Sequence, residues 1–250
     1  MDNLSKIREE MIKRALPLIS STCLSLAVYL LVIYFTLTFE AEISLFKAII
    51  LTSLSCCIVS VSIIAVIISR TTNKKYFRST DYAISAVFIA IFSSSIWWGM
   101  LLPSFVYLVV PFATALTFYL PESLIFGAYT RLVPKPGSSL LLFLGYCFIS
   151  EMIYPNAFWI PYYLAWGAFL EIYFAITGEF CSSRLSRLTG GFLFGVAGAG
   201  LCMVYMLVGW RFYRPLFLSI PAITIDGLFS TVGTYLGSKI GDKAKSISVT

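Results

Sequence analysis

The 250-residue chain contains no histidine and few charged residues of either sign. Asp, Glu, Lys and Arg make up 12% of it, hydrophobic residues make up 59%, and the mean hydropathy is +0.88. Soluble globular domains carry about 25% charged residues, so this composition predicts an integral membrane protein. The absence of histidine argues against zinc chemistry and against Ser-His or Cys-His nucleophiles. We therefore expect no enzyme, no metal and no cofactor.

Other missing signals exclude further classes of protein. No small-residue cleavage site follows the first apolar run, so we expect no cleaved signal peptide. The six cysteines lie mostly in apolar runs without metal-type spacing, which predicts core residues and no disulfide framework. The glycine-rich stretch 190–200 lies in an apolar run with no preceding strand, so it is not a nucleotide-binding loop. The net charge of +6 is attributed to cytoplasmic loops and not to nucleic-acid binding.

Long apolar runs dominate what is present. A membrane-spanning helix needs roughly 20 apolar residues. Eight runs approach or exceed this length, although the fifth has only about fifteen residues and could be re-entrant. They lie at about Leu16–Phe39, Phe46–Ser69, Tyr82–Leu102, Ser104–Tyr129, Ser138–Met152, Trp159–Thr177, Thr189–Gly209 and Leu216–Ser238. The predicted fold is an all-α, multi-pass protein of the cell membrane.

The distribution of basic residues supports this count. With a cytoplasmic N-terminus, the inner segments hold every Lys and Arg except Lys47, Arg211 and Arg214. This follows the positive-inside rule and predicts that both termini are cytoplasmic. The polar segment Arg70–Arg78 marks a boundary. We expect residues 1–75 to form a charged lead-in and a two-helix extension, and residues 76–250 to form a six-helix membrane domain.

Four carboxylates fall within or beside predicted spans: Glu122, Glu151, Glu171 and Asp226. An acidic residue at the centre of a membrane helix costs about 2.5–3.5 kcal/mol, so each is expected to face the bundle interior, a cavity or an interface. The predicted topology places Glu151 near the outer end of its helix, Asp226 near mid-span, and Glu122 and Glu171 nearer the cytoplasm. Snorkelling to the interface is an alternative for Glu151, and helix-to-helix hydrogen bonding is one for Asp226.

Aromatic residues gather on the predicted outer side. Trp97 and Trp98 lie near the end of the third run, and an aromatic segment with two prolines follows Glu151. Aromatic faces beside a carboxylate suit a cationic or flat heteroaromatic ligand. An interfacial aromatic belt is the alternative for most of these residues. The residues expected to line the ligand site here are Asn156, Trp159, Tyr162 and Tyr163, with Trp97 and Trp98 closing it.

Small residues form regular lines on three of the predicted helices. Ala222, Asp226, Ser230, Gly233 and Gly237 make one stripe, and Gly191, Gly195, Gly198 and Cys202 belong to another. Such seams let membrane helices approach closely, so helix packing is the main interpretation. Ala86-x-x-x-Ala90 makes a smaller patch that either packs internally or docks another membrane subunit.

Several of these features occur together in one known family. They are Glu122 with Gly127, the turn Lys135-Pro136-Gly137, Glu151, and Gly167 with Glu171. Together with the stretch 74–92, they resemble the substrate-binding S components of energy-coupling factor (ECF) transporters, in particular the YkoE-like branch associated with thiamine or its hydroxymethylpyrimidine precursor. The resemblance covers roughly residues 75–245, and the two-helix extension is not part of the usual six helices.

The resemblance implies a function. An S component is a six-helix bundle that captures a vitamin-like molecule from outside and docks on a transmembrane coupling subunit served by two ATPases. It implies Ala86 and Ala90 as the docking seam and the turn Lys135-Pro136-Gly137 as a coupling element. Glu151 would line the outward-facing ligand pocket, and Glu122 and Glu171 would sit deeper, as ligand contacts or bundle-organising groups. The chain has no Walker A sequence, so any ATP would be hydrolysed elsewhere.

Three other hypotheses remain open at the level of sequence. The membrane carboxylates could serve a stand-alone proton-coupled transporter. The chain could be an intramembrane enzyme acting on lipid, although no histidine, metal or nucleotide cluster supports this. It could also be a scaffold subunit whose carboxylates only organise helices.

Overall fold

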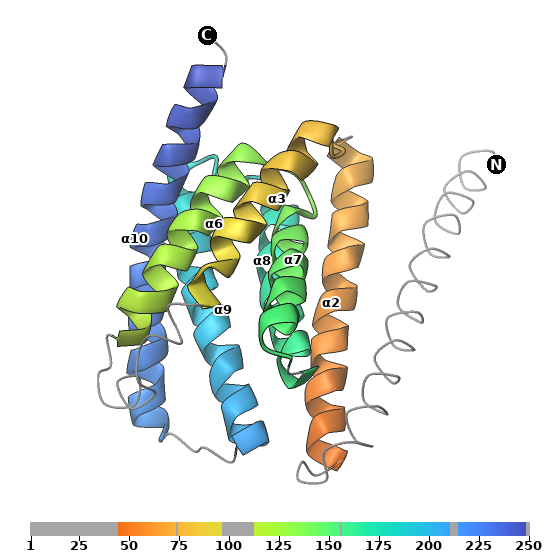
Figure 1. Ribbon diagram of the computed structural model, residues 1–250, viewed down its shortest axis with the longest axis vertical. Coiled ribbons are helices and arrows are strands. Elements are labelled where there is room, and N and C mark those ends of the chain that lie inside the picture. Colours follow the sequence, from red (N-terminus) through yellow and green to blue (C-terminus); the bar gives the residue numbers. More distant parts are fainter. Residues whose placement is uncertain (1–44, 74, 97–112, 156, 211–214, 249–250) are drawn as a thin grey trace, which may run out of the picture.

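The computed structural model describes residues 45–73, 75–96, 113–155, 157–210 and 215–248, and every regular element within these ranges is helical (Figure 1). The all-α prediction is therefore confirmed for the described part of the chain. The helices are α2 (Leu45–Asn73), α3 (Ser79–Ser93), the π-helical segment η1 (Ala115–Tyr119), α6 (Leu120–Leu132), α7 (Ser138–Ile153), the 3₁₀ turn η2 (Ala157–Trp159), α8 (Ile160–Thr177), α9 (Arg184–Trp210) and α10 (Leu216–Ser248).

The observed helices follow the apolar runs, with differences at their ends. α8 ends at Thr177, as predicted, and α7 is short, with 16 residues. α10 continues ten residues beyond the predicted Ser238, because Lys239, Asp242 and Lys243 are compatible with a helix that leaves the apolar layer. Charge ends an apolar run without ending a helix, so the prediction underestimated the length of α10.

Three helices in the described residues are long and apolar enough to cross a membrane: Leu51–Thr72, Arg184–Met206 and Phe217–Ile247. These three helices are consistent with the prediction that the chain is a membrane protein. The count of eight spans and the cytoplasmic placement of the termini stay predictions, and the first run, Leu16–Phe39, lies outside the described residues.

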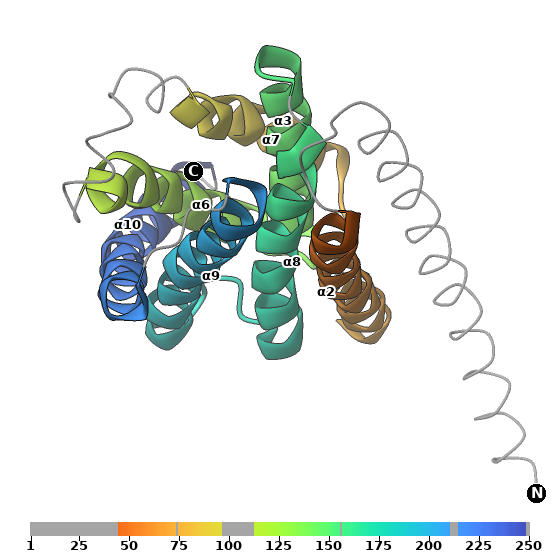
Figure 2. The same cartoon turned by 90° about the horizontal axis from the view of Figure 1, so that it is seen from below.

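The helices form a bundle in which α8 lies between α2 and α9, with α10 beyond α9 (Figure 2). α10 packs most extensively against α6 and α9, and α7 packs against α8 and α3. α2 packs along α8, and its Leu51 belongs to the main hydrophobic core. The second helix of the predicted two-helix extension is thus packed on the bundle, while the division of the chain at residue 75 stays a prediction.

The small-residue stripe of α10 faces its neighbours, as its spacing predicts. Ala222, Asp226, Ser230, Gly233 and Gly237 are all buried. A Cβ atom at Gly237 would overlap the Leu124 carbonyl of α6, and one at Gly191 of α9 would lie 2.8 Å from the Thr231 Cα. These glycines let the backbones of α6, α9 and α10 touch, which van der Waals packing in a membrane requires.

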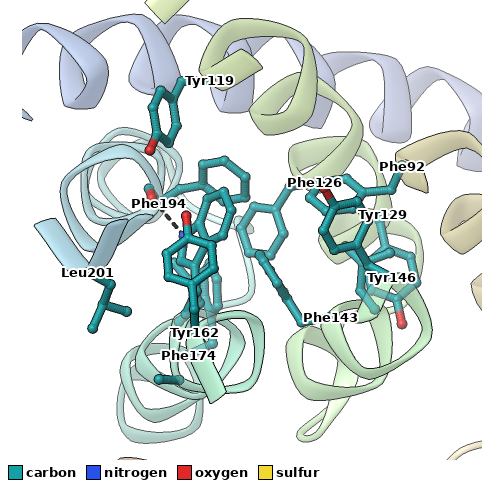
Figure 3. Packing of buried hydrophobic residues seen from close by; sticks show 14 of the residues in the cluster. Phe92, Tyr119, Phe126, Tyr129, Phe143, Tyr146, Tyr162, Phe174, Phe194 and Leu201 are labelled. Carbon is teal, nitrogen blue, oxygen red and sulfur yellow. Dashed lines mark hydrogen bonds between the residues drawn. The ribbon is translucent and has the colours of Figure 1, made fainter. Parts of the chain in front are cut away.

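Aromatic rings fill the centre of the bundle between α6, α7, α8 and α9 (Figure 3). Phe126 lies 4.9 Å from Phe194 between ring centroids, and Trp166 lies 4.8 Å from the same ring. The Trp166 indole N–H donates to the Phe194 carbonyl at 2.9 Å, so the polar atom of this side chain is satisfied. This core separates two regions of different chemistry at its two ends.

Candidate functional site

One region is an aromatic cluster, defined as Tyr119, Tyr146, Trp159, Tyr162, Tyr163, Trp166 and Tyr205. Tyr162 of α8 is central to it. Its ring centroid lies 5.3 Å from Trp159, 5.1 Å from Tyr163 and 5.8 Å from Tyr205. Tyr146 of α7 meets Tyr163 at 4.9 Å, and Tyr119 meets Trp166 at 6.0 Å. The cluster therefore draws on η1, α7, η2, α8 and α9.

Glu122 is the carboxylate associated with this cluster. It is 3% exposed, and its carboxyl group lies in the neighbourhood of Tyr119, Tyr146, Tyr162 and Tyr163. Figure 3 shows the Tyr119 and Tyr162 hydroxyl groups directed toward each other across the bundle. The buried Ser95, just after α3, lies near the same carboxyl group. Glu122 is thus a buried acid close to several tyrosine side chains of the cluster.

The backbone beside Glu122 is unusual. Residues Ala115–Tyr119 are π-helical and lead directly into α6. Single π-helical turns inside α-helices occur frequently at functional sites, because the extra residue redirects the side chains that follow it. Just before this segment, the Thr114 hydroxyl donates to the Asp226 carboxylate at 3.1 Å. Hydrogen bonding between helices was the alternative considered for Asp226 in the sequence analysis, and the structure contains such a bond.

The structure divides the predicted ligand-site residues into three groups. Trp159, Tyr162 and Tyr163 lie together in the aromatic cluster. Glu122 lies near them and belongs to the middle of the helical stretch 113–132. Glu151 lies half-buried in the last turn of α7, where its charge acts on Cys147, and Glu171 lies at the opposite end of the bundle. Asn156, Trp97 and Trp98 lie outside the described residues.

Sequence reasoning did not assign Tyr119, Tyr146 or Ser95 to the site. Tyr119 precedes Glu122 by three residues, a spacing that places two side chains on one helix face, so a signal was present. Tyr146 and Ser95 carry no such signal, because they are distant from Glu122 in sequence and only the packing of the bundle brings them near it.

The second region, the charged end, is defined as Arg70, Asp81, Arg131, Lys135, Glu171, Arg187 and Asp242. It lies where α2, α6, α8 and α10 finish and where α3, α7 and α9 begin (Figure 1). Glu171 of α8 is fully buried there. Its two carboxylate oxygens accept hydrogen bonds from the Gly137 N–H at 2.7 Å and the Ser139 N–H at 2.9 Å.

Glu171 therefore holds the first turn of α7. The first N–H groups of a helix lack partners within it and carry partial positive charge, so a carboxylate is well placed there. Arg70 of α2 reaches the same turn, because its Nε donates to the Pro136 carbonyl at 3.0 Å. Gly137 has a φ of +97°, and a Cβ atom there would lie 2.6 Å from the Arg70 guanidinium group. Glycine is required at this position on both counts.

Ion pairs tie the remaining helices together at this end. Lys135 pairs with Asp81 in the first turn of α3. Asp242 of α10 binds Arg131 of α6 at 2.5 Å and Arg187 of α9 at 2.6 Å. Arg187 also donates to the Cys181 carbonyl at 3.0 Å. Five of the seven described helices, together with the turn before α7, are thus joined by charged groups.

Asp81 precedes the apolar run of α3 and has a shifted pKa. Burial opposes ionisation of its carboxyl group, but a hydrogen bond from Lys135 and another from the Arg78 N–H, at 2.5 Å, outweigh this effect. The pKa of Asp81 is therefore held below its ordinary value of 3.8. The ion pair with Lys135 is present at neutral pH.

The predicted docking residues have contrasting environments. Ala86 and Ala90 lie on the exposed face of α3, beside Val87 and Ile91. Pro136 and Gly137 are buried, and Lys135 is engaged by Asp81. The described contacts of the turn are therefore with its own chain, while the face of α3 is open to lipid or to another subunit.

The chemistry available at the aromatic cluster is binding. Rings supply flat faces and attract cations, and Glu122 supplies a carboxyl group that could pair with a cationic ligand. No group of three or more His, Cys, Asp and Glu residues in the described parts of the chain could hold a metal ion. Comparisons of the chain with known protein families, curated proteins and solved structures returned no significant match.

Proposed function

We propose that this protein is the substrate-capture membrane subunit of an ECF-type importer, and that it binds a vitamin-like molecule, thiamine or a pyrimidine precursor, from outside. The observation that carries the proposal is the packing of Tyr162 against Trp159, Tyr163 and Tyr205, close to the buried carboxyl group of Glu122. The sequence resemblance supplies the class of transporter.

In this proposal the aromatic cluster binds the ligand and the charged end lies at the cytoplasmic side. The described basic residues of the charged end match the cytoplasmic segments predicted by the positive-inside rule, so the aromatic cluster lies toward the outside in this proposal. A ligand would enter from that side, contact Trp159 first and approach Glu122 between the tyrosines. Rings at centroid distances of 5–6 Å already contact one another, so binding requires them to separate.

The exposed face of α3 supports the proposed docking. Ala86 and Ala90 lie one turn apart on this face. Small residues at such spacing let a second membrane helix approach closely. In the proposal, α3 contacts the coupling subunit through this face, and two ATPases bound to that subunit drive uptake.

A proton-coupled transporter is the second candidate. The buried Asp226 and Glu122, both acting on Tyr119, favour it, because carboxylates in membrane helices commonly carry protons. Uptake of thiamine into proteoliposomes driven by a pH gradient, with no ATP and no partner subunit, would support this candidate.

Purification from the native source in mild detergent tests the proposal. We expect mass spectrometry to find one transmembrane coupling subunit and two ATPases, together with a retained thiamine-like molecule. The matched control is a chain carrying Ala86→Leu and Ala90→Leu, which should retain the small molecule and lose the partner subunits. A wild-type chain that purifies alone, yet transports thiamine in proteoliposomes, would contradict the ECF assignment.

A further inference from the structure

The helix α2 reaches the aromatic cluster from outside the six helices that the family resemblance covers. Its Ser55 hydroxyl shares a hydrogen bond of 2.7 Å with the Tyr205 hydroxyl of α9. Ser55 is 1% exposed and Tyr205 is 2% exposed. The two residues are 150 positions apart, so this contact forms only when α2 packs on the bundle.

Tyr205 transmits the position of α2 to the centre of the cluster. Its ring stacks on Trp159 at 6.3 Å with an angle of 18° between the planes, and it meets Tyr162 edge-on at 5.8 Å. A tyrosine ring moves as a rigid body about two torsions, so fixing its hydroxyl group fixes the orientation of its face. The Ser55 bond therefore determines the face that Tyr205 presents to Trp159.

This bond is expected to persist. In a water-poor interior a phenolic hydroxyl without a partner is costly, and the alternative to Ser55 is an unsatisfied group. α2 is also anchored at its far end, where Arg70 donates to the Pro136 carbonyl and lies 5.0 Å above the Phe77 ring. Both anchors hold α2 in a single position against α8.

We propose that α2 forms one wall of the ligand site and that Ser55 is a positioning residue, which orients Tyr205 for contact with a flat ligand held between Tyr205, Trp159 and Tyr162. This inference rests on the proposed function. It assigns the second helix of the extension to specificity for aromatic ligands, a role that the six-helix resemblance does not supply.

The test is calorimetric titration of the detergent-purified full chain with thiamine. Ser55→Ala should weaken binding about five- to tenfold, since it removes one hydrogen bond that orients the site. Ser55→Thr keeps the hydroxyl group and should stay within about twofold of wild type. Ser62→Ala is the matched control, because Ser62 is a fully buried serine of the same helix whose hydroxyl donates to the Val59 carbonyl within α2.

Tyr205→Phe removes the other half of the same bond. The double variant with Ser55→Ala should bind no more weakly than either single variant, because both changes abolish one interaction. Wild-type affinity in Ser55→Ala, or equal weakening by Ser62→Ala, would overturn the role of Ser55 while leaving the proposed function intact. A wild-type chain that binds no thiamine would instead contradict the proposed function and this inference with it.

Discussion

The two ends of the bundle are held by different forces. At the charged end, ion pairs and carboxylate-to-backbone hydrogen bonds join the helices, beside a smaller number of ring contacts such as that of Phe174 with Phe180. At the other end, rings pack on rings beside the buried carboxyl group of Glu122. Directional charged bonds favour a fixed geometry, whereas aromatic contacts tolerate rearrangement at low cost. The comparison suggests that the aromatic end opens for a ligand while the charged end maintains the fold.

Glu171→Ala should produce the largest loss of stability and tests whether the charged end is structural. The change leaves the Gly137 and Ser139 N–H groups buried without an acceptor, at a cost of about 2–4 kcal/mol. Glu171→Gln retains one acceptor oxygen and should lose less. Thermal unfolding in detergent provides the measurement.

The control for this change is Glu179→Ala, which removes an exposed carboxylate from the loop after α8. Its melting temperature should match that of the wild type. If Glu171→Ala melts at the same temperature as this control, the assigned role of the charged end is wrong.

Asp242→Ala should have a smaller effect, because Asp242 is 33% exposed and water partly replaces its lost partners. We expect a loss of about 1 kcal/mol from the separation of α6, α9 and α10 at this end. The loss should diminish in high salt, which screens such pairs. Lys243→Ala, an exposed change one residue away, is the control, and an equal effect of the two changes would argue against a specific bridge.

Asp81→Asn gives the smallest expected effect and carries a pH signature. The pKa of Asp81 is lower in the folded chain than its ordinary value of 3.8. Its ion pair therefore stabilises the fold fully above pH 3.8. This stabilisation is lost as the pH falls through the pKa of Asp81 in the folded chain. The stability difference between wild type and Asp81→Asn should therefore be constant from pH 7 to 5 and shrink below about 3.8. A difference that grows on acidification would contradict this assignment.

Sequence patterns predicted the helices better than they predicted the site. The α10 stripe from Ala222 to Gly237 could be predicted, because burial of small residues follows helical periodicity. The role of Glu171 could not, because its partners are backbone N–H groups in a turn 32–34 residues earlier, and no side-chain pattern records them. Ser55 was also beyond prediction, since one serine among several on α2 shows no sign of a partner 150 residues away.

The prediction that Glu151 contacts the ligand stays a prediction. Glu151 lies half-buried in the last turn of α7. The structure adds that Glu122 lies near tyrosines that are distant from it in sequence, apart from Tyr119. Such contacts between helices cannot be predicted from the spacing of residues along one helix.

Calorimetric titration of Glu122→Gln and Glu171→Gln with thiamine tests the central claim most directly, since the two variants make the same chemical change at opposite ends of the bundle. Glu122→Gln is expected to weaken thiamine binding by about tenfold or more at nearly unchanged stability, because the site loses the carboxyl group that would pair with a cationic ligand. Glu171→Gln should lower stability and leave affinity within about twofold of wild type. Weakened binding in Glu171→Gln with wild-type affinity in Glu122→Gln would contradict the account.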